Sequence, residues 1–202
     1  MREDKARGRH LQWLVPVVIV LLVAVVARLF LTRRADDIPE VYPVDGVLDI
    51  TGMDLSQTVV NVNNSWDFYP NALYTSADFA SGGADRLPEG EGETRYGTYR
   101  LIIKAQPERY YTLCSYSVDY STRVFVNGVE AAGFGVVADN AAESVPRIGY
   151  MTIPLYSGET GEIEVIYQFS NFVHRDGGFI QPTYLSTPQN IEEFKAGNAL
   201  VS

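Results

Sequence analysis

Cysteine and histidine are nearly absent from this sequence. Its 202 residues include one cysteine, Cys114, and two histidines, of which only His174 lies beyond residue 34. A single cysteine excludes a disulfide framework within the chain and a zinc site built from several cysteines. Nucleophilic catalytic triads need a histidine beside a serine or cysteine, and His174 is the one histidine beyond residue 34 that could serve. The G-x-S-x-G motif of many serine hydrolases is also absent from the sequence. We therefore expect no enzymatic activity, no metal site and no cofactor in this chain.

Basic residues are also scarce over most of the chain. Residues 35–202 hold nine basic and 23 acidic groups, a net charge of −14, which excludes a nucleic-acid-binding surface there. So many acids make close carboxylate pairs unavoidable, and such pairs carry no signal for glycoside hydrolysis. Residues 1–34 are different, with seven basic and two acidic groups and a net charge of +5. Two physically different pieces therefore join near residue 34.

The first piece contains the longest apolar run. Residues 13–27 have no polar side chain, and the apolar stretch from Leu11 to Leu31 is 21 residues long, interrupted by Arg28. About 20 such residues cross a bilayer as a helix. We predict a cytoplasmic basic tail over residues 1–10 and a transmembrane anchor over residues 11–32. The excess of Lys and Arg before the run favours an internal N-terminus, with the rest of the chain extracytoplasmic at the cell membrane. A cleaved signal peptide is the alternative.

The second piece has the two-residue period of β-strands. After a polar linker over residues 33–43, apolar and polar side chains alternate through residues 162–171, where Glu162 and Glu164 are expected on a solvated face. Asn127-Gly128 predicts a hairpin turn after a strand over residues 123–126. Further strands are expected at residues 46–50, 59–69, 99–103, 110–118, 151–155 and 179–185, with short helices at residues 76–79 and 188–195.

Several short strands separated by polar turns indicate an all-β fold. We predict a jelly-roll β-sandwich over residues 44–193, preceded by the one N-terminal transmembrane helix, with residues 194–202 as a linker toward a following membrane segment. The sequence shows no internal repeat, so we expect a single folded domain.

Two places in this domain are candidates for ligand binding. Trp66 sits in an alternating aromatic segment, where it is either core or a platform on which a sugar stacks. Residues 170–178 follow a strand and include Asn171, His174 and Arg175. These three side chains either satisfy backbone groups in a structured loop or read a ligand at the edge of the sandwich.

A set of short phrases in a fixed order resembles a known family. They are W-D-F-Y at residues 66–69, Y-G-T-Y-R-L at 96–101, V-N-G at 126–128, S-V-P-R at 144–147, S-N-F-V-H-R-D-G-G at 170–178 and S-T-P at 186–188. The domain is similar to the extracytoplasmic sensor domain of bacterial seven-transmembrane receptors with diverse intracellular signalling modules. These domains are galactose-binding-like jelly rolls, like the accessory sandwich of family-two glycosidases. The resemblance covers roughly residues 44–193.

The resemblance implies a function and adds site residues. The chain would be the N-terminal part of a receptor of the sensor histidine kinase or cyclase type, with its output beyond residue 202. Its ligand would be a carbohydrate or another small neutral molecule, and the receptor would form a homodimer. The resemblance adds Arg100 to the ligand-binding candidates Trp66, Asn171, His174 and Arg175. A membrane-tethered carbohydrate-binding or adhesion module without signalling output is the alternative.

Overall fold

The computed structural model describes residues 16–25, 38–63, 66–82, 94–173 and 182–199. The chain divides into two compact units, Met1–Ile38 and Pro39–Ser202. In the first unit, residues 16–25 form a helix with exposed apolar side chains, among them Ile19 and Leu22. None of the helices in these ranges is both long enough and apolar enough to span a membrane. The expected anchor continues over residues 11–15 and 26–32, which lie outside the described residues.

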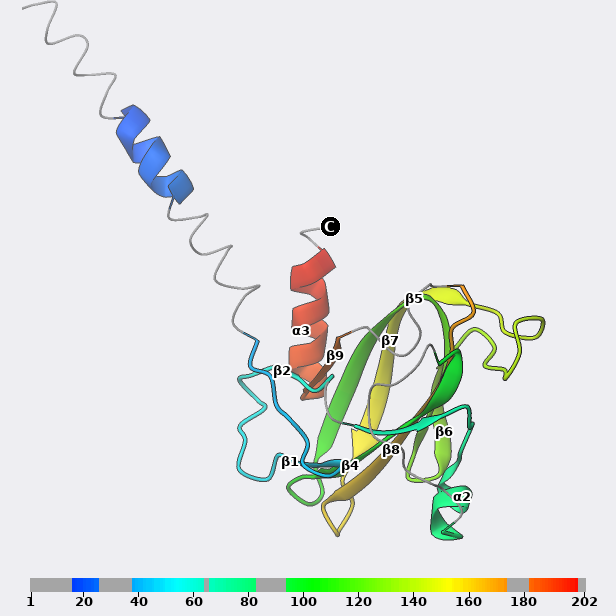
Figure 1. Ribbon diagram of the computed structural model, residues 1–202. Helices are drawn as coiled ribbons and strands as arrows, with labels where there is room; N and C mark the ends of the chain where they lie inside the picture. Colours follow the sequence, from blue (N-terminus) through cyan, green and yellow to red (C-terminus); the bar gives the residue numbers. More distant parts are fainter. Residues whose placement is uncertain (1–15, 26–37, 64–65, 83–93, 174–181, 200–202) are drawn as a thin grey trace, which may run out of the picture. The chain divides into compact units, whose positions relative to one another are not determined.

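The second unit is mostly β-structure. Its nine described strands form one sheet that curls into two layers (Figure 1). Layer A has the strand order β7-β5-β9-β2, and layer B runs from β1 and β3 through β4, β8 and β5 to β6. The strands are β1 (Val47–Asp49), β2 (Val60–Asn61), β3 (Asp67–Pro70), β4 (Tyr96–Lys104), β5 (Tyr110–Val126), β6 (Val129–Phe134), β7 (Arg147–Tyr156), β8 (Glu162–Ser170) and β9 (Thr183–Ser186). The helices of this unit are α2 (Ser76–Ala80) and α3 (Pro188–Ala199).

Strand β5 belongs to both layers. Its first half pairs with β7 and β9 in layer A, and its second half pairs with β8 and β6 in layer B. The register against β7 shifts between Ser117 and Tyr120, and such an irregularity lets a strand bend without ending. The sequence predicted two strands here, over residues 110–118 and 123–126. They are one strand because β5 changes partners from β7 and β9 to β8 and β6 without interruption, and no glycine or proline in residues 118–122 ends it.

The hairpin predicted at Asn127-Gly128 is confirmed. It joins β5 to β6, and both turn residues have positive φ, 49° for Asn127 and 80° for Gly128. This is the conformation of a type I′ turn, whose twist matches that of the flanking strands. The expected helices are also present, although α3 extends to Ala199. Residues 194–199, which we expected to be linker, thus belong to a helix of this unit.

The hydrophobic core lies between the two layers. Because side chains alternate along a strand, each strand of the sandwich sends every second residue inward. In β8 these are Ile163, Val165 and Tyr167, each at most 1% exposed. Other core side chains with exposures of 1% or less include Leu48 of β1, Leu101 and Ile103 of β4, Leu113 and Val124 of β5, Ile153 and Leu155 of β7, Leu185 of β9, and Ile50 and Val62 in the loops.

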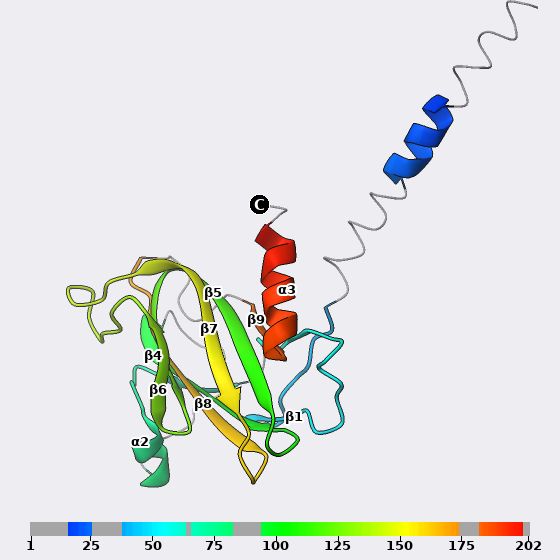
Figure 2. The same ribbon diagram turned by 180° about the vertical axis from the view of Figure 1, so that it is seen from behind.

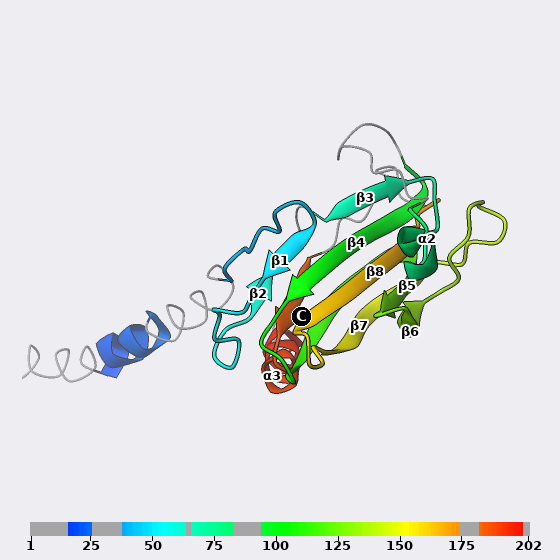
Figure 3. The same ribbon diagram turned by 90° about the horizontal axis from the view of Figure 1, so that it is seen from below.

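The outer face of layer B is covered near α2, contrary to the expectation of a solvated strand (Figure 3). Glu164 of β8 accepts a hydrogen bond from Ser76 of α2 and pairs with Arg100 of the neighbouring strand β4. Its side chain is only 19% exposed. The alternating pattern correctly placed Glu164 on the outer face, but it gave no information about the helix that packs there.

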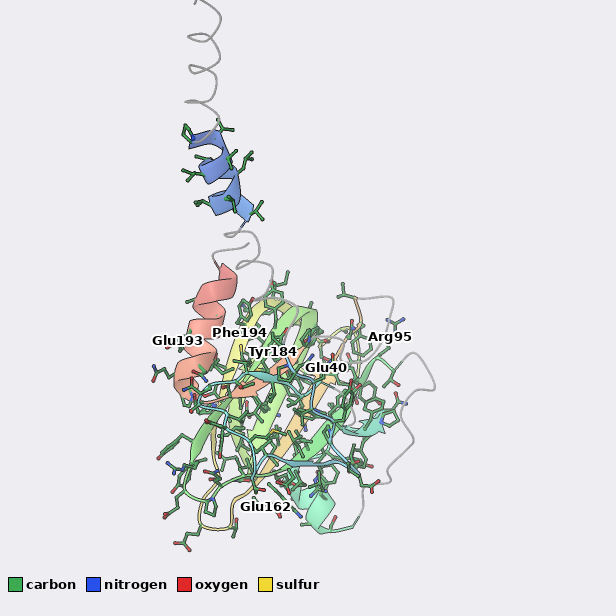
Figure 4. All side chains as sticks on the ribbon, turned by 90° about the vertical axis from the view of Figure 1, so that its left-hand side faces the viewer. Glu40, Arg95, Glu162, Tyr184, Glu193 and Phe194 are labelled. Carbon is green, nitrogen blue, oxygen red and sulfur yellow. The ribbon has the colours of Figure 1, made fainter. Side chains whose placement is uncertain are left out.

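The outer face of layer A is partly covered by α3. Phe194 packs against Tyr184 of β9 with ring centroids 4.7 Å apart (Figure 4). Ile191 is fully buried, and the Lys195 ammonium donates to the Thr152 hydroxyl of β7 at 3.3 Å. Cys114, on the outward side of β5, is fully buried as well. Burial raises the pKa of the Cys114 thiol, which is therefore protonated and unreactive at neutral pH.

Candidate functional site

A cleft of about 550 Å³ lies at one end of the sandwich. Three segments form it: the loop after β1, the connection from β4 to β5, and the residue that follows β9. The lining residues are Thr51, Gly52, Met53, Asp54, Leu55, Ser56, Gln106, Arg109, Tyr110, Tyr111 and Thr187. A cleft of this size is in the range that holds small-molecule ligands in proteins.

The loop after β1 is shaped by two similar turns. In each, an aspartate carboxylate accepts two hydrogen bonds from the residue two positions later, one from its backbone N–H and one from its hydroxyl. Asp49 accepts both from Thr51, and Asp54 accepts both from Ser56. Asp and Asn make such turns readily because the short side chain mimics a backbone carbonyl. The hydrogen bonds from Ser56 lower the pKa of the Asp54 carboxyl, and those from Thr51 lower the pKa of Asp49. Both carboxylates are therefore charged at neutral pH.

Hydrogen bonds from beneath hold the cleft walls in place. The buried Ser186 hydroxyl donates toward the backbone oxygens of Leu55 and Thr58, at 2.9 and 2.8 Å. The Asn190 amide of α3 also donates to the Leu55 oxygen, at 2.9 Å. On the opposite wall, the Ser157 hydroxyl donates to the Gln106 oxygen at 2.7 Å. The cleft is thus preorganised, because its loops are tied to strands and to α3.

The lining can recognise a neutral polar molecule. Among the described lining residues, one carboxylate (Asp54) and one guanidinium (Arg109) balance each other in charge. The remaining groups are mostly hydroxyls, an amide and tyrosine rings. Hydroxyls and amides both donate and accept hydrogen bonds, and tyrosine adds a flat apolar surface with a polar end. This combination suits a ligand that carries many hydroxyl groups on an apolar ring.

Arg100, expected to contact ligand, makes intramolecular contacts on the outer face of layer B. Its Nε and Nη2 atoms both lie 2.8 Å from Oε1 of Glu164. Its guanidinium also lies over the Phe79 ring of α2, 4.6 Å from the centroid. These contacts hold α2 against β4 and β8. The side chain is 29% exposed, and the cleft is lined by other residues.

Trp66, the second candidate, lies in the core. Its side chain is 6% exposed, and its ring meets that of Tyr167 edge to face with centroids 6.4 Å apart. The indole Nε1 donates to the Val62 oxygen at 2.5 Å. A ring on which a sugar stacks needs an exposed face. The Trp66 ring is instead buried against Tyr167, so the structure places it in the core.

Asn171 is buried at the end of the sandwich opposite the cleft. It follows Ser170 of β8, which pairs with Tyr96 at the start of β4, whereas the cleft lies beyond the end of β4. Its backbone N–H donates to the Arg95 oxygen at 2.6 Å, and 2% of the residue is exposed. The candidates His174 and Arg175 fall outside the described residues.

Sequence reasoning therefore missed the cleft residues. The signals for them were weak: two Asp-x-Ser/Thr steps within residues 49–56, and Arg109 beside a tyrosine pair at a predicted strand start. Both patterns are common in ordinary turns, and only the fold brings the two segments together. Within the described residues no group of three or more His, Cys, Asp or Glu side chains is placed to hold a metal ion.

No family model matches the chain, and no curated protein matches it in sequence. Among solved structures, it is similar to a GH2 β-galacturonidase from Eisenbergiella tayi bound to galacturonate, at 11% identity and a TM-score of 0.40. The match covers 64% of this chain and 24% of that one. It is also similar to a β-glucosidase from Paenibacillus barengoltzii, at 11% identity and a TM-score of 0.29, over 74% of this chain and 13% of that one. The chain therefore spans about a quarter or less of these glycosidases.

Proposed function

We propose that the chain is the extracytoplasmic ligand-binding domain of a membrane receptor, and that the cleft binds a carbohydrate or another small neutral ligand. The observation that supports this most is the cleft itself. It has a preorganised wall, balanced charge and neutral hydrogen-bonding groups beside Tyr110 and Tyr111. A receptor domain of this kind acts by binding ligand better in one arrangement than in another, which shifts the signalling equilibrium.

The proposed role is binding rather than catalysis. Most glycosidases use two carboxyl groups on either side of the scissile bond. Asp54 is the one acidic side chain among the described lining residues, and its hydrogen bonds with Ser56 lower its pKa. A general acid in this reaction needs a raised pKa instead.

Ligand binding can be tested by thermal shift of the full chain against monosaccharides, disaccharides and polyols. A ligand at 100 times its dissociation constant stabilises the folded state by about 2.7 kcal/mol. Arg109→Gln should reduce this stabilisation, whereas Arg147→Gln, at the far end of β7 from the cleft, should not. No shift with any of these compounds, or equal effects of the two substitutions, would count against the cleft as a binding site.

The membrane location rests on the sequence, through the apolar run over residues 11–32 and its flanking basic residues. Cell fractionation tests it. We expect the full chain in the membrane fraction after alkaline extraction and expect Val20→Asp with Val23→Asp to release it. A chain found in the soluble fraction without these substitutions would contradict the proposal. If ligand binds but the natural polypeptide carries no output module, the domain is a tethered binding module instead.

A further inference from the structure

The two outer faces of the sandwich differ in charge. On layer B, charged side chains of neighbouring strands pair across the surface, as in Arg100 with Glu164 and Arg123 with Glu130. On layer A, the adjacent strands β5 and β7 carry no charged side chain over residues 110–118 and 148–156. Two uncharged strands side by side stand out in a domain whose residues 35–202 have a net charge of −14.

Tyrosines form two pairs across these two strands, and three of the four rings are exposed. Tyr110 of β5 packs against Tyr156 of β7 with ring centroids 4.7 Å apart. Tyr116 of β5 packs against Tyr150 of β7 with centroids 4.6 Å apart. Tyr110, Tyr150 and Tyr156 are 67%, 49% and 43% exposed. Exposed aromatic pairs in register across two strands make a flat surface rather than a core.

The register fixes the distance between the two pairs. They are six residues apart on each strand, which corresponds to ~20 Å at the usual rise of a β-strand. Figure 2 shows β7 running beside β5. Between the two pairs, Thr152 and Pro154 of β7 are exposed. The strip's own side chains are neutral, with an aromatic pair at each end. Between the pairs the exposed surface belongs to β7, because Thr112 and Cys114 of β5 are buried, and Lys195 of α3 borders it at the Thr152 hydroxyl.

One tyrosine connects this strip to the cleft. Tyr110 lines the cleft and is also a member of the first tyrosine pair. A molecule that leaves the cleft past Tyr110 can continue along β7 toward Tyr150. A single small ligand cannot contact both places, whereas an extended one can.

We propose that the outer face of β5 and β7 binds a neutral, linear glycan, with one end of the glycan in the cleft and its following units on the two tyrosine pairs. The proposal rests on the proposed function and names its ligand class as oligosaccharide rather than single sugar. Pyranose rings present apolar C–H faces that pack on aromatic rings, and their hydroxyls bond to Thr and Tyr hydroxyls. The strands of the strip carry no charged side chain of their own, which suits a neutral ligand.

The test is isothermal titration of the full chain with the hexaoses of three neutral β-linked glycans (glucan, xylan and mannan), each compared with its own disaccharide. Tyr150→Ala removes a ring of the distant pair, and Tyr150→Phe keeps the ring without the hydroxyl. Tyr42→Ala is the matched control, because Tyr42 is 57% exposed and belongs to neither the cleft lining nor the strip.

We expect at least one hexaose to bind more tightly than its disaccharide. Tyr150→Ala should weaken the hexaose by about tenfold, the effect of losing roughly 1.4 kcal/mol of ring stacking, and leave the disaccharide unchanged. Tyr150→Phe should retain most of the hexaose affinity, and Tyr42→Ala all of it.

Several outcomes would overturn the proposal. They are equal affinities for hexaose and disaccharide, no binding of any hexaose, and equal effects of Tyr150→Ala and Tyr42→Ala. A dimer that Tyr150→Ala dissociates in sedimentation would show that the strip is an interface between copies. Disaccharide binding without length dependence would remove this inference and leave the proposed function standing. Hexaose binding that depends on Tyr150 but not on Arg109 would support glycan binding on the strip and would count against the cleft as a binding site.

Discussion

Single side chains hold the interior of the sandwich through polar as well as apolar contacts. The Trp66 indole fills space beside Tyr167 and at the same time satisfies the Val62 oxygen. Tyr167 is buried with its hydroxyl 3.3 Å from that of Ser115, and burial raises the pKa of the phenol. Such residues combine packing with hydrogen bonding, so a substitution at one of them removes both contributions together.

Trp66→Phe should destabilise the domain. The change leaves a small cavity and an unpaired Val62 oxygen, at a cost of about 1–3 kcal/mol. Urea denaturation measures the loss, with Tyr42→Phe at an exposed position as the control. The folded variant should bind ligand as the unchanged chain does, because Trp66 lies outside the cleft and the tyrosine strip. Normal stability with lost binding would instead place Trp66 in contact with ligand.

The loop that shapes the cleft should respond to acid through Asp54. Hydrogen bonds from Ser56 lower the pKa of Asp54 in the folded state below its ordinary value of 3.8. A lowered folded pKa gives a contribution to stability that is complete above the unfolded pKa and is lost as pH falls through the folded pKa. The difference in unfolding free energy between the unchanged chain and Asp54→Asn should therefore be largest at neutral pH and shrink below pH 3.8. A difference that stays constant from pH 7 to pH 3 would contradict this reasoning.

At the scale of elements, α3 has few anchors. Its fully buried Ile191 and its contact between Phe194 and Tyr184 hold it on layer A. Most of its other described side chains are polar, so the helix depends on these contacts rather than on an extended apolar face. Cys114, on the outward side of β5, is fully buried where α3 packs on layer A, and its accessibility therefore measures whether the helix is docked.

Ile191→Ala should increase the rate at which a thiol reagent labels Cys114. Loss of the buried side chain costs about 2–5 kcal/mol of helix packing, and each opening of α3 exposes the thiol. Labelling of the full chain under native conditions is specific, because Cys114 is its one cysteine. Gln189→Ala, at an exposed position of the same helix, is the control. Equal rates for the two variants would show that α3 does not cover Cys114.

The elements differ in how well the sequence predicted them. The strand over Glu162–Ser170 and the turn at Asn127-Gly128 were predicted closely, because a period of two and the preference for positive φ are local properties. The single strand β5 was not, because its crossing between layers depends on the strands on each side. Residues 59–69 were predicted as one strand and form two short ones, β2 and β3, which pair with different layers.

At the scale of the whole molecule, the strands on the two outer faces of the sandwich differ in charge. The sequence gives the net charge of −14 for residues 35–202, while the fold places the uncharged strands β5 and β7 together. A neutral glycan forms no ion pairs with the protein. Because salt screens interactions between charges, its binding affinity should depend little on salt concentration. An anionic ligand would be repelled by the domain as a whole.

Binding of the neutral hexaoses should therefore change by less than about twofold between low and physiological salt. A galacturonate hexaose is the anionic comparison, and any binding of it should strengthen as salt screens the repulsion. Titrations at 20 and 150 mM sodium chloride measure both. Neutral-ligand affinity that falls steeply with salt would indicate that charged groups such as Arg109 dominate recognition.

The sequence by itself determined the class of fold and the division of the chain. The period of two in the strands, the turn residues and the change of charge near residue 34 are local or additive properties, and they predicted a β domain after a basic, apolar N-terminal piece. The tertiary structure decided which residues meet. Arg100 pairs with Glu164 across two strands, Trp66 turns into the core, and the cleft joins residues 51–56 to residues 106–111 and Thr187. Strand pairing and helix docking over long sequence separations create these contacts, and no single stretch of the sequence encodes them.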